Sequence, residues 1–74
     1  MKIRFLRSLT VDVEKIKLGE VWDKSFNRWD EIVIENIFPN GSLATLKTSE
    51  GDFILGVPLD SFEKLKEEKK VVTL

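Results

Sequence analysis

Residues 29–57 read WDEIVIENIFPNGSLATLKTSEGDFILGV, and two turn signals divide this stretch into three runs of β-prone residues. Pro39-Asn40-Gly41 predicts a three-residue loop in which glycine takes the left-handed position. Glu50-Gly51 predicts a two-residue hairpin loop. We therefore expect an antiparallel meander of three strands, against which the rest of the chain packs.

The second turn predicts which residues of its hairpin face each other. With a two-residue loop at the tip, Leu46 pairs with Leu55 and Ala44 pairs with Val57. These four side chains would form one continuous apolar face. A slip of the register by one residue would place Lys47 in that face, so we expect the apolar register to form the core.

The same register assigns further side chains of the meander to its two faces. Ile34 would face Leu46 across the first hairpin, and Glu35 would lie diagonal to Lys47 as an oppositely charged surface pair. Other apolar side chains of the meander would point away from the core and form an exposed apolar patch. Such a patch indicates contact with a protein partner or with a second copy of this chain. The residues expected in this partner-binding patch are Val33, Ile37, Leu43 and Ile54.

Length and composition narrow the class of protein. The 74 residues suit a single domain, residues 1–74, with little room for a deep pocket. The absence of cysteine and histidine excludes disulfides, thiolate or imidazole metal ligands, and a nucleophile activated by a histidine base. No phosphate-binding loop or dinucleotide fingerprint is present. We expect a protein that is not an enzyme and that binds no cofactor and no metal.

Charge and hydropathy indicate the environment of the chain. Residues 1–28 carry 7 basic and 4 acidic side chains, whereas residues 29–63 carry 1 and 7, within a net charge of −1. An acidic meander argues against dominant contact with a nucleic-acid backbone. No apolar stretch approaches the roughly 18 residues of a membrane span. We expect a soluble, cytoplasmic protein without membrane contact.

The residues before the meander predict additional strands. Five apolar residues of segment 3–13 share one parity: Ile3, Phe5, Leu9, Val11 and Val13. This pattern suits either one long bent strand or two shorter strands that meet near Arg7 and Ser8. A turn at residues 17–19 would lead into a short strand at 20–23. Residues 24–28 are expected to form a loop.

This loop suggests a second candidate function. Aromatic side chains next to basic ones are typical of surfaces that bind single-stranded nucleic acid. The alternative is that Trp22 and Phe26 only cap the open end of a small barrel. The nucleic-acid candidates are Trp22, Lys24, Phe26, Arg28 and Trp29.

The pattern changes after residue 57, where Pro58 ends the third strand of the meander. Asp60 and Glu63 have the spacing of a capping box, which predicts a helix over residues 61–69. Residues 71–74 are apolar and β-branched and are expected to form a last strand. The side chains expected to dock the helix are Leu59, Phe62 and Leu65.

The order of these features resembles the layout of SH3-like and Tudor-like small barrels. The resemblance covers about residues 18–65: a tryptophan, three strands separated by a Gly turn and by Glu50-Gly51-Asp52, and a short helix. The tyrosines of a Tudor aromatic cage are absent. The resemblance implies a mainly β fold, an SH3-like barrel of about five strands with one short C-terminal helix, and a binding function. We expect a protein-binding or self-associating module, acting as a regulator or accessory factor, with single-stranded nucleic-acid binding as the alternative.

Overall fold

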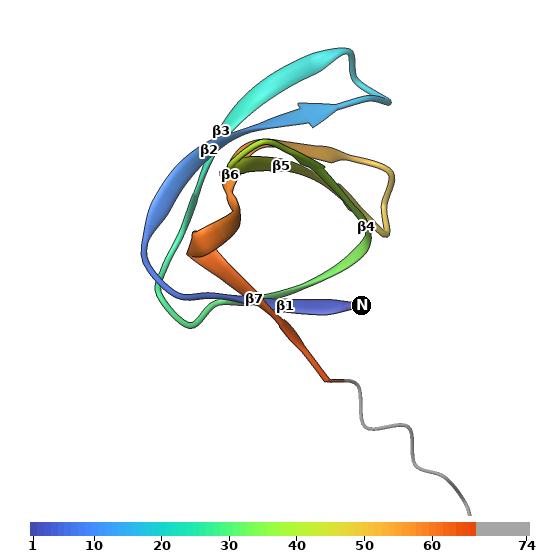
Figure 1. Cartoon of the computed structure of the whole chain (residues 1–74). Helices are drawn as coiled ribbons and strands as arrows, with labels where there is room; N and C mark the ends of the chain where they lie inside the picture. Colours follow the sequence, from blue (N-terminus) through green and yellow to red (C-terminus); the bar gives the residue numbers. More distant parts are fainter. Residues whose placement is uncertain (67–74) are drawn as a thin grey trace, which may run out of the picture.

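The computed structural model of the protein describes residues 1–66 and shows a mainly β fold (Figure 1). All seven strands belong to one antiparallel sheet with the order β3-β2-β6-β5-β4-β1-β7. A single-turn 3-10 helix, η1 (Leu59–Ser61), connects the last two strands. The strands are β1 (Lys2–Phe5), β2 (Leu9–Lys15), β3 (Glu20–Phe26), β4 (Glu31–Asn40), β5 (Leu43–Thr48), β6 (Phe53–Pro58) and β7 (Phe62–Leu65).

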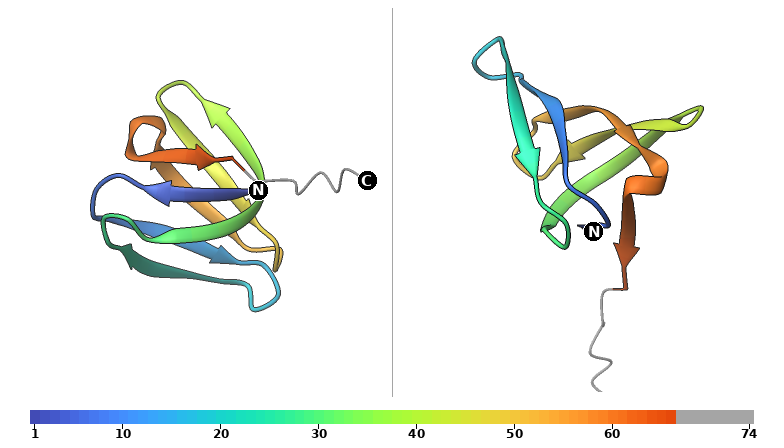
Figure 2. Two further views of the ribbon diagram at one scale, coloured as in Figure 1. Left: turned by 90° about the horizontal axis from the view of Figure 1, so that it is seen from below. Right: turned by 90° about the vertical axis from the view of Figure 1, so that its left-hand side faces the viewer.

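The sheet curls strongly but does not close. Its ends are β3 and β7, and the β2–β3 hairpin extends beyond the rest of the sheet (Figure 2). Strand β4 belongs to both halves of the curl, since its residues 31–33 pair with β1 and its residues 34–40 pair with β5. The fold is therefore an open sheet of seven strands, where the sequence predicted a barrel of about five. Within residues 1–66, no helix is long and apolar enough to cross a membrane.

The meander is confirmed as β4, β5 and β6, but both turns differ in length from the expectation. The first is a two-residue loop, because Asn40 pairs with Leu43 and only Gly41 takes a positive φ, 63°. The second is a three-residue loop, residues 49–51, in which Gly51 takes φ 92°. It is longer because Thr48 pairs with Asp52: its amide donates to the Asp52 carbonyl at 2.8 Å, and its hydroxyl oxygen accepts from the Asp52 amide at 3.1 Å.

Two bulges change the register within the meander. Ala44 pairs with Val57 as predicted, but Leu46 pairs with Ile54 instead of Leu55, because β6 has one extra residue beside Gly56. Gly56 has φ 63°, a conformation that favours glycine. The first turn, in which Asn40 pairs with Leu43, brings Ile37 rather than Ile34 opposite Leu46, and a second irregularity, between Ile34 and Asn36 of β4, then places Ile34 opposite Thr48.

Each extra residue reverses the alternation of faces beyond it, so the predicted partner-binding patch is not one surface. Ile54 is 2% exposed and belongs to the core, and Ile37 packs against the core. Val33 and Leu43 are exposed, at 55% and 44%. The Glu35–Lys47 surface pair is confirmed, with 3.6 Å between its charged atoms.

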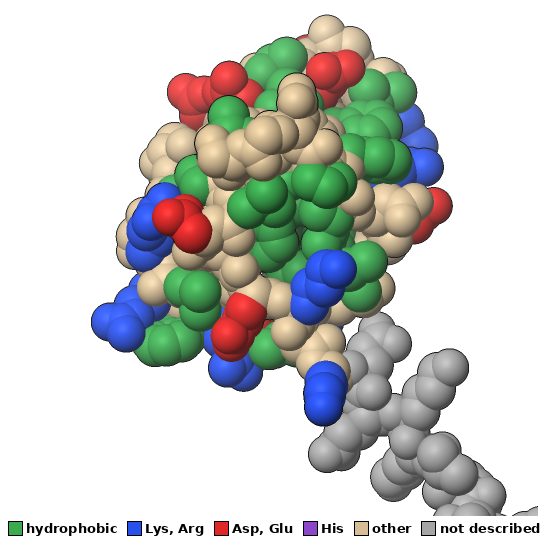
Figure 3. Space-filling view, in the orientation of Figure 1, with side chains coloured by type: hydrophobic (Ala, Val, Ile, Leu, Met, Phe, Trp, Pro, Cys, Tyr) green, Lys and Arg blue, Asp and Glu red, His purple; other side chains and the backbone are tan. Residues whose placement is uncertain are grey.

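The core lies inside the curl, where the end-on space-filling view shows hydrophobic side chains in the middle of the face (Figure 3). Each of the strands β1 to β7 contributes at least one buried side chain to this core. The buried hydrophobic residues are Ile3, Phe5, Val11, Val13, Phe26, Ile34, Ala44, Leu46, Ile54, Val57 and Phe62.

The N-terminal segment forms two strands rather than one. β1 and β2 meet at a bend over residues 6–8, at the place where the parity pattern breaks. The Arg7 guanidinium lies outside the sheet and pairs with the Asp60 carboxylate at 3.1 Å. The amide of Leu6 donates to the carbonyl of Ser61 at 2.8 Å, which joins the bend to η1.

The helix predicted for residues 61–69 is wrong for the residues that the structure describes. Asp60 caps no helix, because its carboxylate binds Arg7, and the backbone returns to extended geometry at Phe62. Residues 62–65 form β7, which pairs with the edge of β1 left open by β4. Arg4 of β1 contacts the carboxylates of both Glu31 and Glu63, so the charge pattern supports this pairing. The rest of that helix and the strand expected at residues 71–74 lie outside the described residues.

Candidate functional site: a groove beside strand β3

Strand β3 is longer than expected and presents alternate residues to the concave side of the sheet. It runs to Phe26, so residues 24–26 belong to a strand and not to a loop. Trp22 pairs with Val13 and Phe26 pairs with Leu9 on β2. Because Val13 faces the core, Trp22 and Phe26 share that face, and Lys24 lies between them on the same face.

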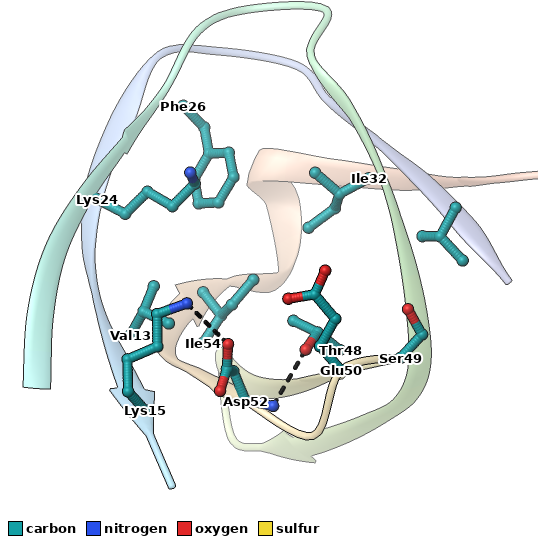
Figure 4. A pocket seen from close by; sticks show the side chains of 11 residues that line it. Val13, Lys15, Lys24, Phe26, Ile32, Thr48, Ser49, Glu50, Asp52 and Ile54 are labelled. Atoms are coloured by element: carbon teal, nitrogen blue, oxygen red, sulfur yellow. Dashed lines mark hydrogen bonds and ion pairs between the residues drawn. The ribbon is translucent and has the colours of Figure 1, made fainter. Parts of the chain in front are cut away.

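A hollow of about 200 Å³ opens at this concave face (Figure 4). Its apolar side chains come from four strands, and its polar side chains come mainly from the turn between β5 and β6. This volume is smaller than the roughly 300–1,000 Å³ of typical small-molecule sites, so the hollow suits an inserted side chain. The lining residues used below are Val13, Phe26, Ile32, Ile54, Lys24 and Glu50.

An ion pair borders this hollow where β2 meets the start of β6. The Lys15 ammonium donates to the Asp52 carboxylate at 2.8 Å, and the two side chains are 28% and 14% exposed. The hydrogen bond to Asp52 raises the pKa of Lys15, against the opposing effect of desolvation. Lys15 therefore stays protonated and paired, which makes it a structural link between β2 and the turn rather than a proton-transfer group.

A second, more open hollow of about 510 Å³ adjoins the first. The two share four lining residues: Lys15, Ser49, Glu50 and Asp52. The second hollow adds Lys17, Leu18 and Trp22, and the centre of the Trp22 ring lies 5.3 Å from the Lys15 ammonium. Together the hollows form a continuous depression from Phe26 to Leu18 along the concave side of β3, which we call the β3 groove.

The opposite, convex face of the β2–β3 hairpin is acidic. Asp12 pairs with Asp23 across the two strands, and Glu14 is two residues from Asp12 on the same face. A hydrogen bond to Asp23, with desolvation and the negative charge of Asp23, raises the pKa of Asp12. Among residues 1–66, no lysine or arginine forms an ion pair with these three carboxylates.

A second exposed feature is the turn that follows β3. The Asp30 amide donates to the Asn27 carbonyl at 3.0 Å, and Trp29 takes φ 76°, which is strained for a residue with a large side chain. The Trp29 amide donates to the Phe5 carbonyl at 2.7 Å, which holds this conformation. The Arg28 guanidinium lies 4.5 Å from the centre of the exposed Trp29 ring.

The residues predicted for protein binding do not lie together in the structure, and neither do those predicted for nucleic-acid binding. Phe26 is buried and stacks on Phe5 with 4.4 Å between ring centres, so it is not available for stacking on a base. Trp22 and Lys24 line the β3 groove, whereas Arg28 and Trp29 form the separate turn. Of the predicted partner-binding residues, Val33 and Ile54 line the hollow and Leu43 and Ile37 do not.

Lys15 and Asp52 were not predicted as site residues, since they are 37 positions apart in the sequence. Only the packing of β2 against β6 brings them together, and no local pattern indicates that contact. Within residues 1–66, no cluster of three or more carboxylates is arranged to hold a metal ion.

Comparison with known proteins adds no assignment, because no protein-family model, no curated protein and no solved structure matches this chain.

Proposed function

We propose that this protein is a small non-catalytic protein-binding module that holds an extended segment of a partner along the free edge of β3. The observation that carries the proposal is the position of that edge beside the β3 groove. β3 pairs with β2 alone, so its second edge has no strand partner among the described residues. Unpaired backbone amides and carbonyls at a sheet edge bind an added strand.

An added strand would use the groove directly. Alternate side chains of a strand paired with β3 lie on the same face as Lys24 and Phe26, which is the face that lines the hollow. Main-chain hydrogen bonds would supply affinity, and side chains in the hollow would supply selectivity. The seven residues of β3 offer a longer edge than the four residues of β7.

Exposed apolar side chains on β3 support the same interpretation. Val21 is 59% exposed and Trp22 is 49% exposed, on opposite faces of the strand. Tryptophan and aliphatic side chains at an accessible edge are typical anchors of protein contacts. We also propose that the chain has an SH3-like barrel layout, which is supported by the meander that leads into η1 and β7. The proposed role is that of a regulator or accessory factor.

Site-specific photo-crosslinking tests the proposal. A photo-reactive residue in place of Trp22 is expected to crosslink a protein from the native extract, with or without nuclease treatment. The matched control carries the same residue in place of Leu43, which is similarly exposed, at 44% against 49% for Trp22, but does not line the groove. Crosslinking at both positions alike, or at neither, would show that the β3 groove holds no protein partner.

Single-stranded nucleic-acid binding is a second candidate, favoured by one observation. The strained backbone at Trp29 holds an exposed ring beside the Arg28 guanidinium, an arrangement on which a base can stack. Titration of a labelled oligonucleotide at low salt tests it. Replacing either residue with alanine should weaken binding by roughly 1–3 kcal/mol if the pair stacks on a base. No binding by the parent protein at low salt would exclude this function.

A further inference from the structure

We propose that the segment bound at β3 alternates basic and apolar residues, with lysine or arginine on the convex side of the sheet and apolar side chains in the β3 groove. This inference rests on the proposed function and specifies the chemistry of the partner. It follows from the different character of the two faces of β3.

The convex face calls for a cation. A partner residue opposite Asp23 would lie within about 5 Å of its Cβ, on the same face as Asp12 and Glu14. These carboxylates have no ion-pair partner among residues 1–66, and Asp12 and Asp23 repel each other. A lysine or arginine at that position would relieve the repulsion, whereas a glutamate or aspartate would add to it.

The concave face calls for an apolar side chain. Neighbouring residues of a partner strand point to the other side of the sheet, into the hollow bounded by Phe26, Ile32 and Ile54. The charged side chains that line this hollow are either paired, as Lys15 is with Asp52, or exposed to solvent, as Lys24 and Glu50 are. An apolar side chain therefore gains contact surface there without leaving a buried charge unpaired.

The structure already contains a strand of this kind. β1 has the sequence KIRF, in which Ile3 and Phe5 are fully buried and Lys2 and Arg4 lie on the convex side. Arg4 contacts the Glu31 carboxylate of β4 at 3.1 Å and the Glu63 carboxylate of β7 at 3.6 Å. Alternating basic and apolar residues are thus the pattern that pairs with carboxylate-bearing edges in this sheet.

A second copy of β3 does not fit the requirement. Cross-strand neighbours share a face, so Asp23 would meet a residue from the convex face of the other copy. Those residues are Val21, Asp23 and Ser25, none of which carries a positive charge. A segment of a different protein, with its own lysine or arginine residues, is therefore the better occupant.

Binding of two synthetic peptides tests this inference. The first alternates lysine with isoleucine over eight residues, and the second has glutamate in place of every lysine. We expect the basic peptide to bind the parent protein at least about tenfold more tightly, since each cross-strand charge pair changes affinity by about two- to fivefold. Added salt should reduce this difference.

A charge exchange on the protein provides the matched test. Asp23→Lys should reduce the preference for the basic peptide, whereas Asp60→Lys, the same charge change on η1, should leave it unaltered. Chemical-shift changes of backbone amides should follow β3 in the complexes. Equal affinity for both peptides, no binding of either, or a preference that Asp23→Lys does not reduce would overturn the proposed partner chemistry. Crosslinking at position 22 would still support a protein partner in that case, so the two failures are distinguishable.

Discussion

At the scale of single residues, Asp12 and Asp23 illustrate how an exposed pair affects stability. The hydrogen bond between them and their like charges raise the pKa of Asp12 above its ordinary value of 3.8. The folded chain therefore binds this proton more tightly than the unfolded chain does. The resulting stabilisation is complete below the unfolded pKa and is lost as the pH rises through the folded pKa.

Asp12→Asn should prevent this loss of folding stability at higher pH, because an asparagine amide can donate a hydrogen bond to the Asp23 carboxylate at any pH. We expect the variant to melt at a higher temperature than the parent at about pH 7 and at the same temperature at about pH 3. Thermal unfolding followed by circular dichroism at both pH values measures the difference. Glu14→Gln, which removes a charge from the same face without that hydrogen bond, is the control. A constant difference between Asp12→Asn and the parent at both pH values would contradict the explanation.

At the scale of the strands, the two bulges decide which side chains enter the core. The extra residue beside Gly56 in β6 turns Ile54 inward, where simple alternation places Leu55. Glycine suits this position because its φ of 63° is unfavourable for other residues. The bulge in β4 similarly separates Val33, which is exposed, from Ile37, which packs against the core.

Lysine substitutions at Ile54 and Val33 test this assignment. Ile54→Lys places an unpaired ammonium in the core and should unfold the domain, since the cost exceeds the ~5 kcal/mol by which small domains are stable. Val33→Lys lies at an exposed position and should change the free energy of unfolding by about 0.5 kcal/mol or less. Urea denaturation measures both. A folded Ile54→Lys protein would show that the register of β6 is wrong.

At the scale of the whole molecule, the order of strands separates a protected centre from two accessible edges. Among residues 1–66, β5 and β6 have a strand on both sides, whereas β3 and β7 have one neighbouring strand each. Backbone hydrogen bonds hold η1, which leads into β7: the Leu6 amide donates to the Ser61 carbonyl, and the Leu59 amide donates to the Ser42 carbonyl. β3 is the longer of these two edges and has no strand on its outer side among residues 1–66, which is the property expected of a strand that accepts a partner.

Hydrogen exchange followed by NMR tests this distribution of stability. We expect the amides of β5, which has a strand on both sides, to exchange more slowly than those of β3, which pairs with β2 alone. Addition of the basic peptide should slow exchange in β3 alone, with β7 as the internal control. Equal protection of β3 and β5 in the free protein would contradict an open edge at β3.

The sequence by itself determined the features that depend on neighbouring residues. The meander, the places of its two turns though not their lengths, the pairing of Ala44 with Val57 and the bend near Arg7 were all indicated locally, because glycine conformation and strand alternation act over a few residues. The isolated Gly56 within a strand was also a signal for a bulge, although it was not used.

Only the tertiary structure decided the features that depend on distant contacts. The capping-box pattern at Asp60 predicted a helix, but Arg7 binds its carboxylate and the unpaired edge of β1 draws residues 62–65 into a strand. The β3 groove depends in the same way on Lys15 meeting Asp52. Local propensities differ by fractions of a kcal/mol, whereas an open sheet edge and an exposed apolar face involve several groups at once, so long-range pairing prevails.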